Sequence, residues 1–319
     1  MRSRRAAELG EARVLKIHYS LKRADDTPLV LAIGFFDGMH RGHADIARQA
    51  RRLRKPGWST AVLTFAEHPS AFLRPGSEPP LITTSEERID LFARAGYEEC
   101  FFIPFDAAIA TQTPEQFLHE TLIRDLGARG VVVGRTFRFG KARAGDVGLM
   151  AKVLESSGVA FTAVENTADE NGTRISSTRI RELIASGEVE AADELLGHAY
   201  ELRGKVVLGA GRGHGLGFPT ANLDVPQKLL PKDGIYAGIA RHEGRDRAAL
   251  ISIGTNPTFD GKGRTVEAWL RDFHDTIYGE ELVLRDLRFV REQLKFENAD
   301  DLLAQMQDDA KAVPYPTYG

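Results

Sequence analysis

Residues 29–43 constrain the fold of this chain more than any other stretch. Residues 29–33 are all apolar, which is typical of a strand buried on both faces of a sheet. Between residues 46 and 53, apolar side chains recur at helical spacing with arginines on the other side. A buried strand, a tight turn and a helix start therefore follow one another. Such a unit is typical of parallel α/β sheets.

The turn between this strand and this helix carries two histidines, His40 and His43. Backbone N–H groups and the positive dipole end at a helix start attract a phosphate. Two imidazoles beside that start can donate to phosphoryl oxygens as charge develops in a transition state. The alternative is a strand–helix connection whose histidines cap the helix or pack. We favour the phosphate site, because the two histidines are spaced by Gly42 and preceded by Asp37 and Gly38.

Strands and helices alternate from residue 29 to about residue 165. After the first strand and helix, strands are predicted at 60–65, 101–103, 131–133 and 159–164, and helices at 85–95, 113–126 and 150–154. This alternation predicts a doubly wound parallel sheet with ligands at the carboxyl ends of the strands. We therefore expect the histidine turn and the loops that follow Phe65 and Gly134 to converge on one crevice.

A hydroxyl-rich segment with two further arginines, residues 174–181, follows this alternating pattern. One hydroxyl at a helix start is an ordinary N-cap. Three hydroxyl residues in a row, followed by Arg179 and Arg181, are more than a cap needs. Hydroxyls, free N–H groups and a guanidinium together suit a polyphosphate. We favour phosphate binding here, with capping as part of the same geometry.

The periodicity becomes strand-like beyond a boundary that we place near residue 185. Residues 1–185 and 186–319 are predicted as two domains, because the chain is long enough for two cores. In the second domain, strands are predicted at 200–208, 234–240, 247–253, 265–270 and 282–290, and a final helix from an Asn298 cap to about residue 312. Several short strands with one terminal helix predict a small β-barrel.

A glycine-rich stretch, residues 209–217, precedes Thr220 and Asn222. Glycines let the backbone approach a ligand closely. Thr220 and Asn222 offer two neutral oxygens, which suit a hard cation such as Mg²⁺ shared with phosphates. The alternative is a surface loop without a ligand. We favour the ligand site, because an aromatic, a proline and a hydroxyl residue follow one another at the end of the stretch.

Charge and composition argue against several classes of protein. The net charge is −3 with both signs dispersed, so no electrostatic footprint for nucleic acid is present. No apolar run approaches the length of a membrane span. Cys100, the only cysteine, cannot form an internal disulfide or a cysteine metal cluster. We expect a cytoplasmic enzyme without nucleic-acid or membrane partners, and leave a weak homo-oligomer open.

Three motifs carry a resemblance to known families. The run GFPTANL at 217–223 resembles the riboflavin kinase domain. GFFDGMHRGH at 34–43 contains HxGH after a buried strand, as in the nucleotidyltransferase superfamily. With ISSTRIR at 175–181, the chain from about residue 28 to 312 resembles the bacterial bifunctional riboflavin kinase/FAD synthetase. This implies ATP as co-substrate, Mg²⁺ as cofactor, and riboflavin, FMN and FAD as substrates or products.

The resemblance also implies roles for individual residues. His40 and His43 stabilise the ATP phosphates during transfer of AMP to FMN. Glu267 takes the proton from the riboflavin 5′-hydroxyl, although the strand pattern alone would make it a solvent-exposed residue. Thr220 and Asn222 bind Mg²⁺ and ATP. The other residues expected at ATP phosphates are Gly34, Phe36, Asp37, Gly38, Gly42, Ser177, Thr178, Arg181, Gly215 and Gly217. Those expected near flavin are Phe65, Pro69, Phe139, Phe218 and Pro219.

Two departures from the family pattern lie in the first half. Thr136 stands where the family commonly has Asp or Asn, and Ala66 and Glu67 replace an Asp-Pro pair. They leave open an alternative in which the first half binds flavin or regulates without transferring AMP. A second alternative is a related transferase with a different acceptor. We do not favour it, because it gives no function to residues 200–312.

Overall fold

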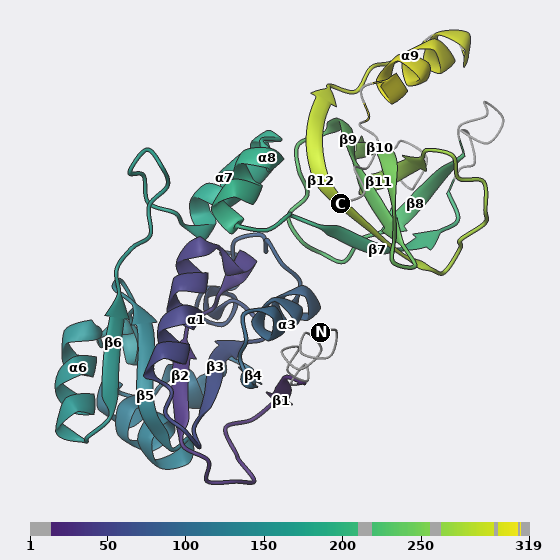
Figure 1. Ribbon diagram of the computed structural model, residues 1–319. Coiled ribbons are helices and arrows are strands. Elements are labelled where there is room, and N and C mark those ends of the chain that lie inside the picture. Colours follow the sequence, from purple (N-terminus) through teal and green to yellow (C-terminus); the bar gives the residue numbers. More distant parts are fainter. Residues whose placement is uncertain (1–13, 210–218, 256–262, 297–298, 312, 314–319) are drawn as a thin grey trace, which may run out of the picture. The chain divides into compact units, whose positions relative to one another are not determined.

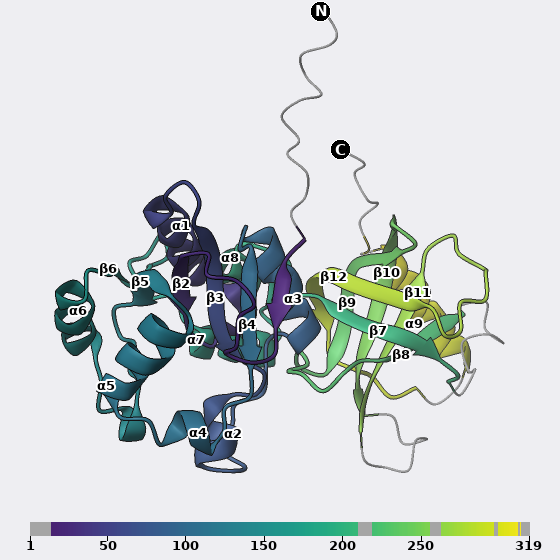
Figure 2. The same cartoon turned by 90° about the horizontal axis from the view of Figure 1, so that it is seen from below.

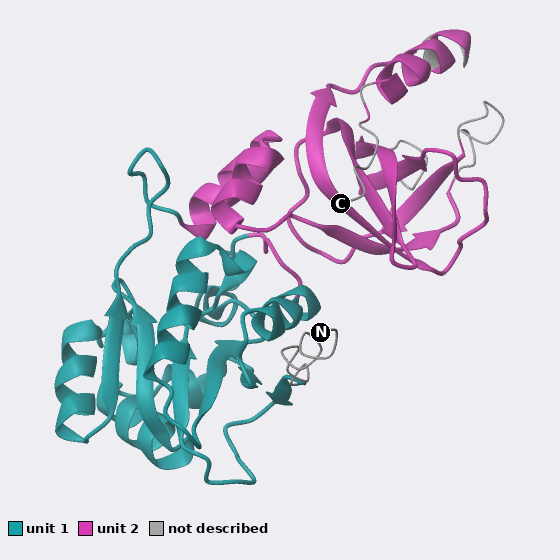
Figure 3. Cartoon of the chain, viewed as in Figure 1, with its two compact units in different colours: residues 1–79, 85–175 teal, residues 80–84, 176–319 magenta. Residues whose placement is uncertain are grey.

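A computed structural model describes the chain except for residues 1–13, 210–218, 256–262, 297–298, 312 and 314–319 (Figure 1, and Figure 2 in a second view). The chain divides into two compact units, residues 1–79 with 85–175 and residues 80–84 with 176–319 (Figure 3). The predicted domain boundary near residue 185 stays a prediction. Across the described ranges, none of the helices has the length and apolarity needed to cross a membrane.

The first unit is built on a parallel sheet with the strand order β1-β4-β3-β2-β5-β6. The strands are β1 Lys16–His18, β2 Leu29–Ile33, β3 Ser59–Phe65, β4 Glu99–Ile103, β5 Ala128–Gly134 and β6 Ala160–Val164. All residues of β2 are buried, as its apolar run predicts. The parallel sheet is confirmed. Strand β1 was missed, because its three residues, one exposed and two half-buried in the edge strand of the sheet, carry no clear pattern.

Helices cover both faces of this sheet, as a doubly wound fold requires. Alternate residues of β2 point to two separate cores, one shared with α1 and α3 and the other with η2 and α6. Figure 2 shows α1 and α5 on opposite sides of the strands. The helices are α1 Arg41–Leu53, α2 Pro69–Leu73, α3 Ser85–Arg94, α4 Ala107–Ala110, α5 Pro114–Gln116 and α6 Val147–Ser156, with the short turns η1 Asp37–Met39 and η3 Lys141–Arg143 and the π-helix η2 Phe117–Asp125.

The helix predicted at 113–126 is present, but most of it is a π-helix rather than an α-helix. It starts on a capping box, in which Thr113 and Gln116 bond each other's backbone N–H groups, and then widens into the π-helix η2. In η2 the N–H of Leu126 donates to the carbonyl of Thr121, five residues earlier. The sequence pattern could not distinguish the two helix types, because both bury the same apolar residues.

The second unit contains the helices α7, α8 and α9 and a closed barrel with the strand order β10-β11-β8-β7-β12-β9. The helices α7 Ser177–Ser186 and α8 Val189–Leu196 are separated at Gly187, where φ is 90°. The strands are β7 Leu202–Val207, β8 Thr220–Asp224, β9 Gly234–His242, β10 Arg245–Thr255, β11 Arg264–Leu270 and β12 Glu281–Arg291, and α9 spans Ala299–Lys311. The predicted barrel and terminal helix are confirmed. The predicted Asn298 cap lies outside the described residues.

Candidate active sites

The histidine turn, residues 34–43, joins β2 to α1 through backbone of unusual conformation. Phe36, Gly38 and Met39 have φ values of 58°, 76° and 39°. The turn packs into the interior of the unit, because Phe36, Asp37, Gly38 and Met39 are all buried. At Gly42, a Cβ atom would lie 3.1 Å from the His40 ring, so a side chain there would press on the first histidine. The turn therefore has one compact shape that carries its histidines.

The two histidines lie together at the start of α1. Their rings stack with centroids 3.6 Å apart and an angle of 17° between the planes. His40 is the N-cap residue, and its Nδ1 accepts a hydrogen bond from the N–H of His43 at 3.3 Å. An accepting Nδ1 carries no proton, so we assign the ring proton of His40 to Nε2. His40 thus caps α1 through Nδ1, and its role at phosphates stays a prediction.

The second histidine of the pair is held as a neutral imidazole. Burial, and then the neighbouring His40, keep the pKa of His43 well below its usual value. Its Nδ1 is buried and has no hydrogen-bond partner among the described residues. A neutral imidazole donates one hydrogen bond, through the ring nitrogen that carries its proton, and the role of His43 at phosphates stays a prediction.

Two of the three predicted loops lie side by side at the carboxyl ends of the strands. The loop after β3 begins at Ala66, and His68 in that loop contacts the Phe35 ring edge-on with centroids 4.8 Å apart. His68 also caps α2 by accepting from the N–H of Ser70, one residue after Pro69. Strand β5, whose carboxyl end carries the third loop, pairs directly with β2. Because β2, β3 and β5 are parallel neighbours, the loops that follow them all lie at the carboxyl end of the sheet. These are the histidine turn, the loop after Phe65 and the loop after Gly134.

The residues expected near flavin have different surroundings. Phe65 is half-buried and contacts Phe105, which in turn contacts the exposed Phe72 of α2. This aromatic row was not predicted beyond Phe65. Phe139 is buried in the sheet core against Phe117, with centroids 5.6 Å apart. The role of Phe139 at flavin stays a prediction, whereas its role in the core is evident.

The hydroxyl-rich segment starts helix α7 of the second unit. Ser176 caps α7 by accepting a hydrogen bond from the N–H of Arg179, so the capping expectation is confirmed. Ser177 and Thr178 lie in the first turn of this helix. The Nε of Arg181 donates to the carbonyl of Pro80 at 2.8 Å. Arg181 thus has a structural contact, and the phosphate roles of these residues stay predictions.

In the barrel, Asn222 of β8 lies directly opposite Glu267 of β11. Thr220, two residues before Asn222, lies opposite Trp269. Side chains alternate along strands, so Thr220, Asn222 and Glu267 share one face of the sheet. Directly opposite residues have Cβ atoms about 5 Å apart and diagonal ones about 7–8 Å. The three residues therefore lie close together on one face, and their roles at Mg²⁺, ATP and riboflavin stay predictions.

Two further residues lie near this face: Gly209, from the predicted glycine-rich stretch, and Ser252, which the sequence analysis missed. A Cβ atom at Gly209 would lie 2.0 Å from the Asn222 amide nitrogen, so only glycine leaves room for that side chain. Ser252 of β10 lies opposite Glu267 on its other side, and it accepts a hydrogen bond from Gln293 Nε2 at 3.2 Å. Gly215, Gly217 and Phe218 lie outside the described residues, while Pro219 is half-buried and directly precedes β8.

A cavity of about 680 Å³ lies apart from the predicted residues of the first unit. It is lined by the segment 19–23, the end of β4 and helix α4, and none of the predicted site residues contributes to its lining.

Comparisons with known proteins agree with this division of sites. The model of the FAD synthetase family matches residues 22–179, and that of the riboflavin kinase family matches residues 196–314. A bifunctional riboflavin kinase/FMN adenylyltransferase from Listeria monocytogenes is 34% identical over 303 residues, which cover 93% of this chain and 96% of the relative. The chain belongs to this bifunctional family.

Other members of the family, and one solved structure, match nearly the whole chain. The relatives with the same name from Bacillus subtilis and Escherichia coli are 32% and 31% identical over 93% and 91% of this chain, and over 95% and 93% of their own lengths. A crystal structure described as a macrolide-efflux protein from Streptococcus pneumoniae has a TM-score of 0.84 and 31% identity, and covers 94% of this chain and 98% of its own. The family predicted from the motifs is confirmed.

Proposed function

We propose that the chain converts riboflavin to FMN in its second unit and FMN to FAD in its first, using ATP in both steps. Membership of the bifunctional family supports the two activities. The observation that supports the division of labour is that each unit holds polar groups suited to its own half-reaction. The first carries a stacked pair of imidazoles, and the second carries a carboxylate opposite an amide.

In the second unit, Glu267 accepts the proton of the riboflavin 5′-hydroxyl as that oxygen attacks the γ-phosphorus of ATP. An alcohol gains from a general base, because it is a poor nucleophile while protonated. The products are FMN and ADP. Asn222, directly opposite Glu267, and Thr220, on the same face, orient the phosphates against this base.

Mg²⁺ fits the oxygens available on this face. Thr220 supplies a hydroxyl and Asn222 an amide oxygen, and both are hard donors of the kind that Mg²⁺ accepts alongside phosphates. When bound, the ion neutralises charge on the ATP phosphates. Gly209 supports this assignment, because it leaves room for the Asn222 side chain.

In the first unit, an oxygen of the FMN phosphate attacks the α-phosphorus of ATP, and pyrophosphate leaves. The FMN phosphate is already an anion, so this step needs no general base. His40 and His43 hydrogen-bond phosphoryl oxygens and stabilise the charge that develops there. The lowered pKa of His43 favours a neutral imidazole, which donates one hydrogen bond through its protonated nitrogen.

A product assay tests both halves of the proposal. Purified chain with riboflavin, ATP and Mg²⁺ is expected to form FMN first and FAD later, resolved by chromatography. FMN that accumulates without FAD at ample ATP would contradict the adenylyl-transfer half. That result would favour the alternative in which the first unit binds flavin or regulates.

A further inference from the structure

Arg88 of α3 is a buried arginine to which the reaction outlined above gives no role. Its exposed fraction is 1%. Nη1 donates to the carbonyl of Phe35 at 3.0 Å, and Nη2 donates to the carbonyl of Ala66 at 3.0 Å. Phe35 belongs to the histidine turn, and Ala66 begins the loop after β3. One guanidinium therefore joins two loops that come from neighbouring strands.

The surroundings of Arg88 hold this guanidinium in one place. It lies over the ring of Phe35 at 4.3 Å and over that of Phe102 at 5.0 Å. The Phe35 carbonyl also accepts from the Thr64 hydroxyl at 3.0 Å. Burial lowers the pKa of Arg88 to about 10, and the nearby Asp37 carboxylate, itself in the histidine turn, acts in the opposite direction. Arg88 therefore stays charged at neutral pH.

We propose that Arg88 is a positioning residue for adenylyl transfer, which sets the separation between the histidine turn and the loop after β3. This inference rests on the function proposed above. In that function the histidine turn holds the ATP phosphates, and the loop after β3 lies between Phe65 and Pro69, which are on the flavin side. The FMN phosphate must reach the α-phosphorus of ATP in line, so the loop separation sets the separation of the reacting atoms.

The geometry of the contact requires arginine rather than any cation. The two bonds leave different nitrogens of one planar group and reach two carbonyls on separate loops. A lysine ammonium is a point charge on a flexible chain and does not reproduce this fork. A displacement of about 1 Å at a reacting centre costs about 100-fold in rate. Arg88→Lys should therefore fold and still lose activity.

The test compares Arg88→Lys and Arg88→Met in the full chain. We expect the kcat of FAD formation to fall about tenfold in the lysine variant and about 100-fold in the methionine variant. The KM values for ATP and FMN should stay within about threefold, because each loop still holds its own substrate. Riboflavin phosphorylation in the same samples should stay within about twofold, since the barrel has its own site.

Ile89→Ala is the matched control, because Ile89 packs its half-buried side chain from the same helix against the same core. It should lower the thermal midpoint without lowering the kcat of FAD formation at temperatures where the variant is folded. Unchanged kcat in Arg88→Lys, or an equal loss in Ile89→Ala, would overturn the inference. If Arg88→Met does not fold, Arg88→Lys alone decides. A wild-type chain that makes no FAD would instead count against the proposed function.

Discussion

At the scale of single residues, the half-buried carboxylate of Glu267 is a candidate base because of the residues beside it in the sheet. Its cross-strand neighbours are Asn222 on one side and Ser252 on the other, and both are polar. The residues on either side of it in the chain, Val266 and Ala268, are buried in the barrel. Glu267 thus projects from a rigid strand, which is a better support for a catalytic group than a loop.

Glu267→Gln should lower the rate of FMN formation by a factor of about 10²–10⁴, the usual loss for a general base. Glutamine keeps the size and polarity of the side chain but accepts no proton at neutral pH. FMN supplied directly should still be converted to FAD at the wild-type rate. Glu281→Gln, at an exposed position on β12, is the control that should change neither step. Loss of both steps in a folded Glu267→Gln protein would refute the assignment of separate sites.

His43→Ala should show the reverse pattern. Removal of one donor that stabilises a transition state costs about 10²–10³ in rate, so FAD formation should fall by that factor while FMN formation is unchanged. His119→Ala is the matched control, because His119 is an exposed histidine in the same unit. A wild-type rate of FAD formation in His43→Ala would remove the imidazole pair from the chemistry.

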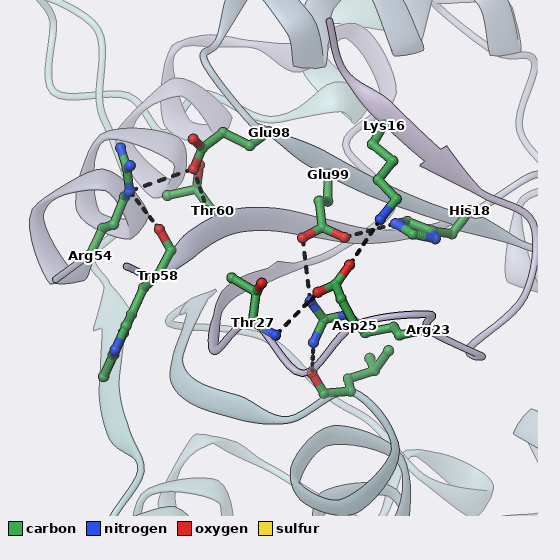
Figure 4. A network of polar contacts seen from close by, with 11 residues as sticks. Lys16, His18, Arg23, Asp25, Thr27, Arg54, Trp58, Thr60, Glu98 and Glu99 are labelled. Atoms are coloured by element: carbon green, nitrogen blue, oxygen red, sulfur yellow. Dashed lines mark hydrogen bonds and ion pairs between the residues drawn. The ribbon is translucent and has the colours of Figure 1, made fainter. Parts of the chain in front are cut away.

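At the scale of elements, strand β1 is attached to the sheet by a buried polar network (Figure 4). Glu99 of β4 accepts from His18 Nε2 at 2.8 Å and pairs with Arg23 at 3.4 Å. The side chains of Arg23 and Glu99 are 5% and 7% exposed, whereas the neighbouring Lys16–Asp25 pair is 51% and 40% exposed. The buried pair is therefore the one whose disruption should destabilise the edge of the sheet.

Glu99→Ala should lower the free energy of unfolding by about 3 kcal/mol, because it leaves the buried Arg23 charge without one of its carboxylate partners. Lys16→Met, which breaks only the exposed pair, should cost about 1 kcal/mol or less. Chemical denaturation of the two variants measures both values. Equal losses would mean that burial does not set the strength of this network.

Helix α8 contains a carboxyl that titrates near neutral pH. Burial raises the pKa of Asp193 to about 7, partly opposed by the hydrogen bond it accepts from the N–H of Tyr200. The folded state therefore holds the proton more tightly than the unfolded state. This contribution is fully favourable only at low pH, and it is lost as the pH rises from about 4 to about 7.

Asp193→Asn keeps an oxygen for the Tyr200 N–H but carries no charge. Its gain in stability over wild type should grow between pH 5 and pH 7.5 and then stay constant. We expect about 1–2 kcal/mol at the plateau, after allowing for screening of a half-buried group. Thermal unfolding at several pH values measures this difference. A gain that does not change with pH would show that the Asp193 carboxyl is not the titrating group.

At the scale of the whole molecule, the function proposed above places the two activities in separate units, which have separate cores. Each site should then work when the other is disabled. A mixture of Glu267→Gln and His43→Ala proteins should convert riboflavin to FAD, with FMN passing through solution, although neither variant does so alone at a comparable rate. Product chromatography over time measures this. No FAD from the mixture would show that FMN must be made and used within one chain.

The parallel sheet and the barrel could be derived from the sequence, because they depend on short-range signals, and the resemblance of three motifs implied the family and its two activities. A buried strand shows as an apolar run, a barrel strand as alternation, and a helix start as a cap. The motif around His40 and His43 and the run ending in Asn222 lie within single turns or strands. Their local spacing already determines which side chains lie together.

Tertiary structure decided what depends on contacts between distant segments. Three findings depend on residues that are far apart along the chain. Asn222 pairs with Glu267, Phe139 is buried, and Arg88 bonds both Phe35 and Ala66. Arg88 did leave one signal, since it lies four residues before the buried Phe92 on α3 and so places a charge on the apolar face. Whether such a charge is buried, and what it binds, follows only from the packing of the folded chain.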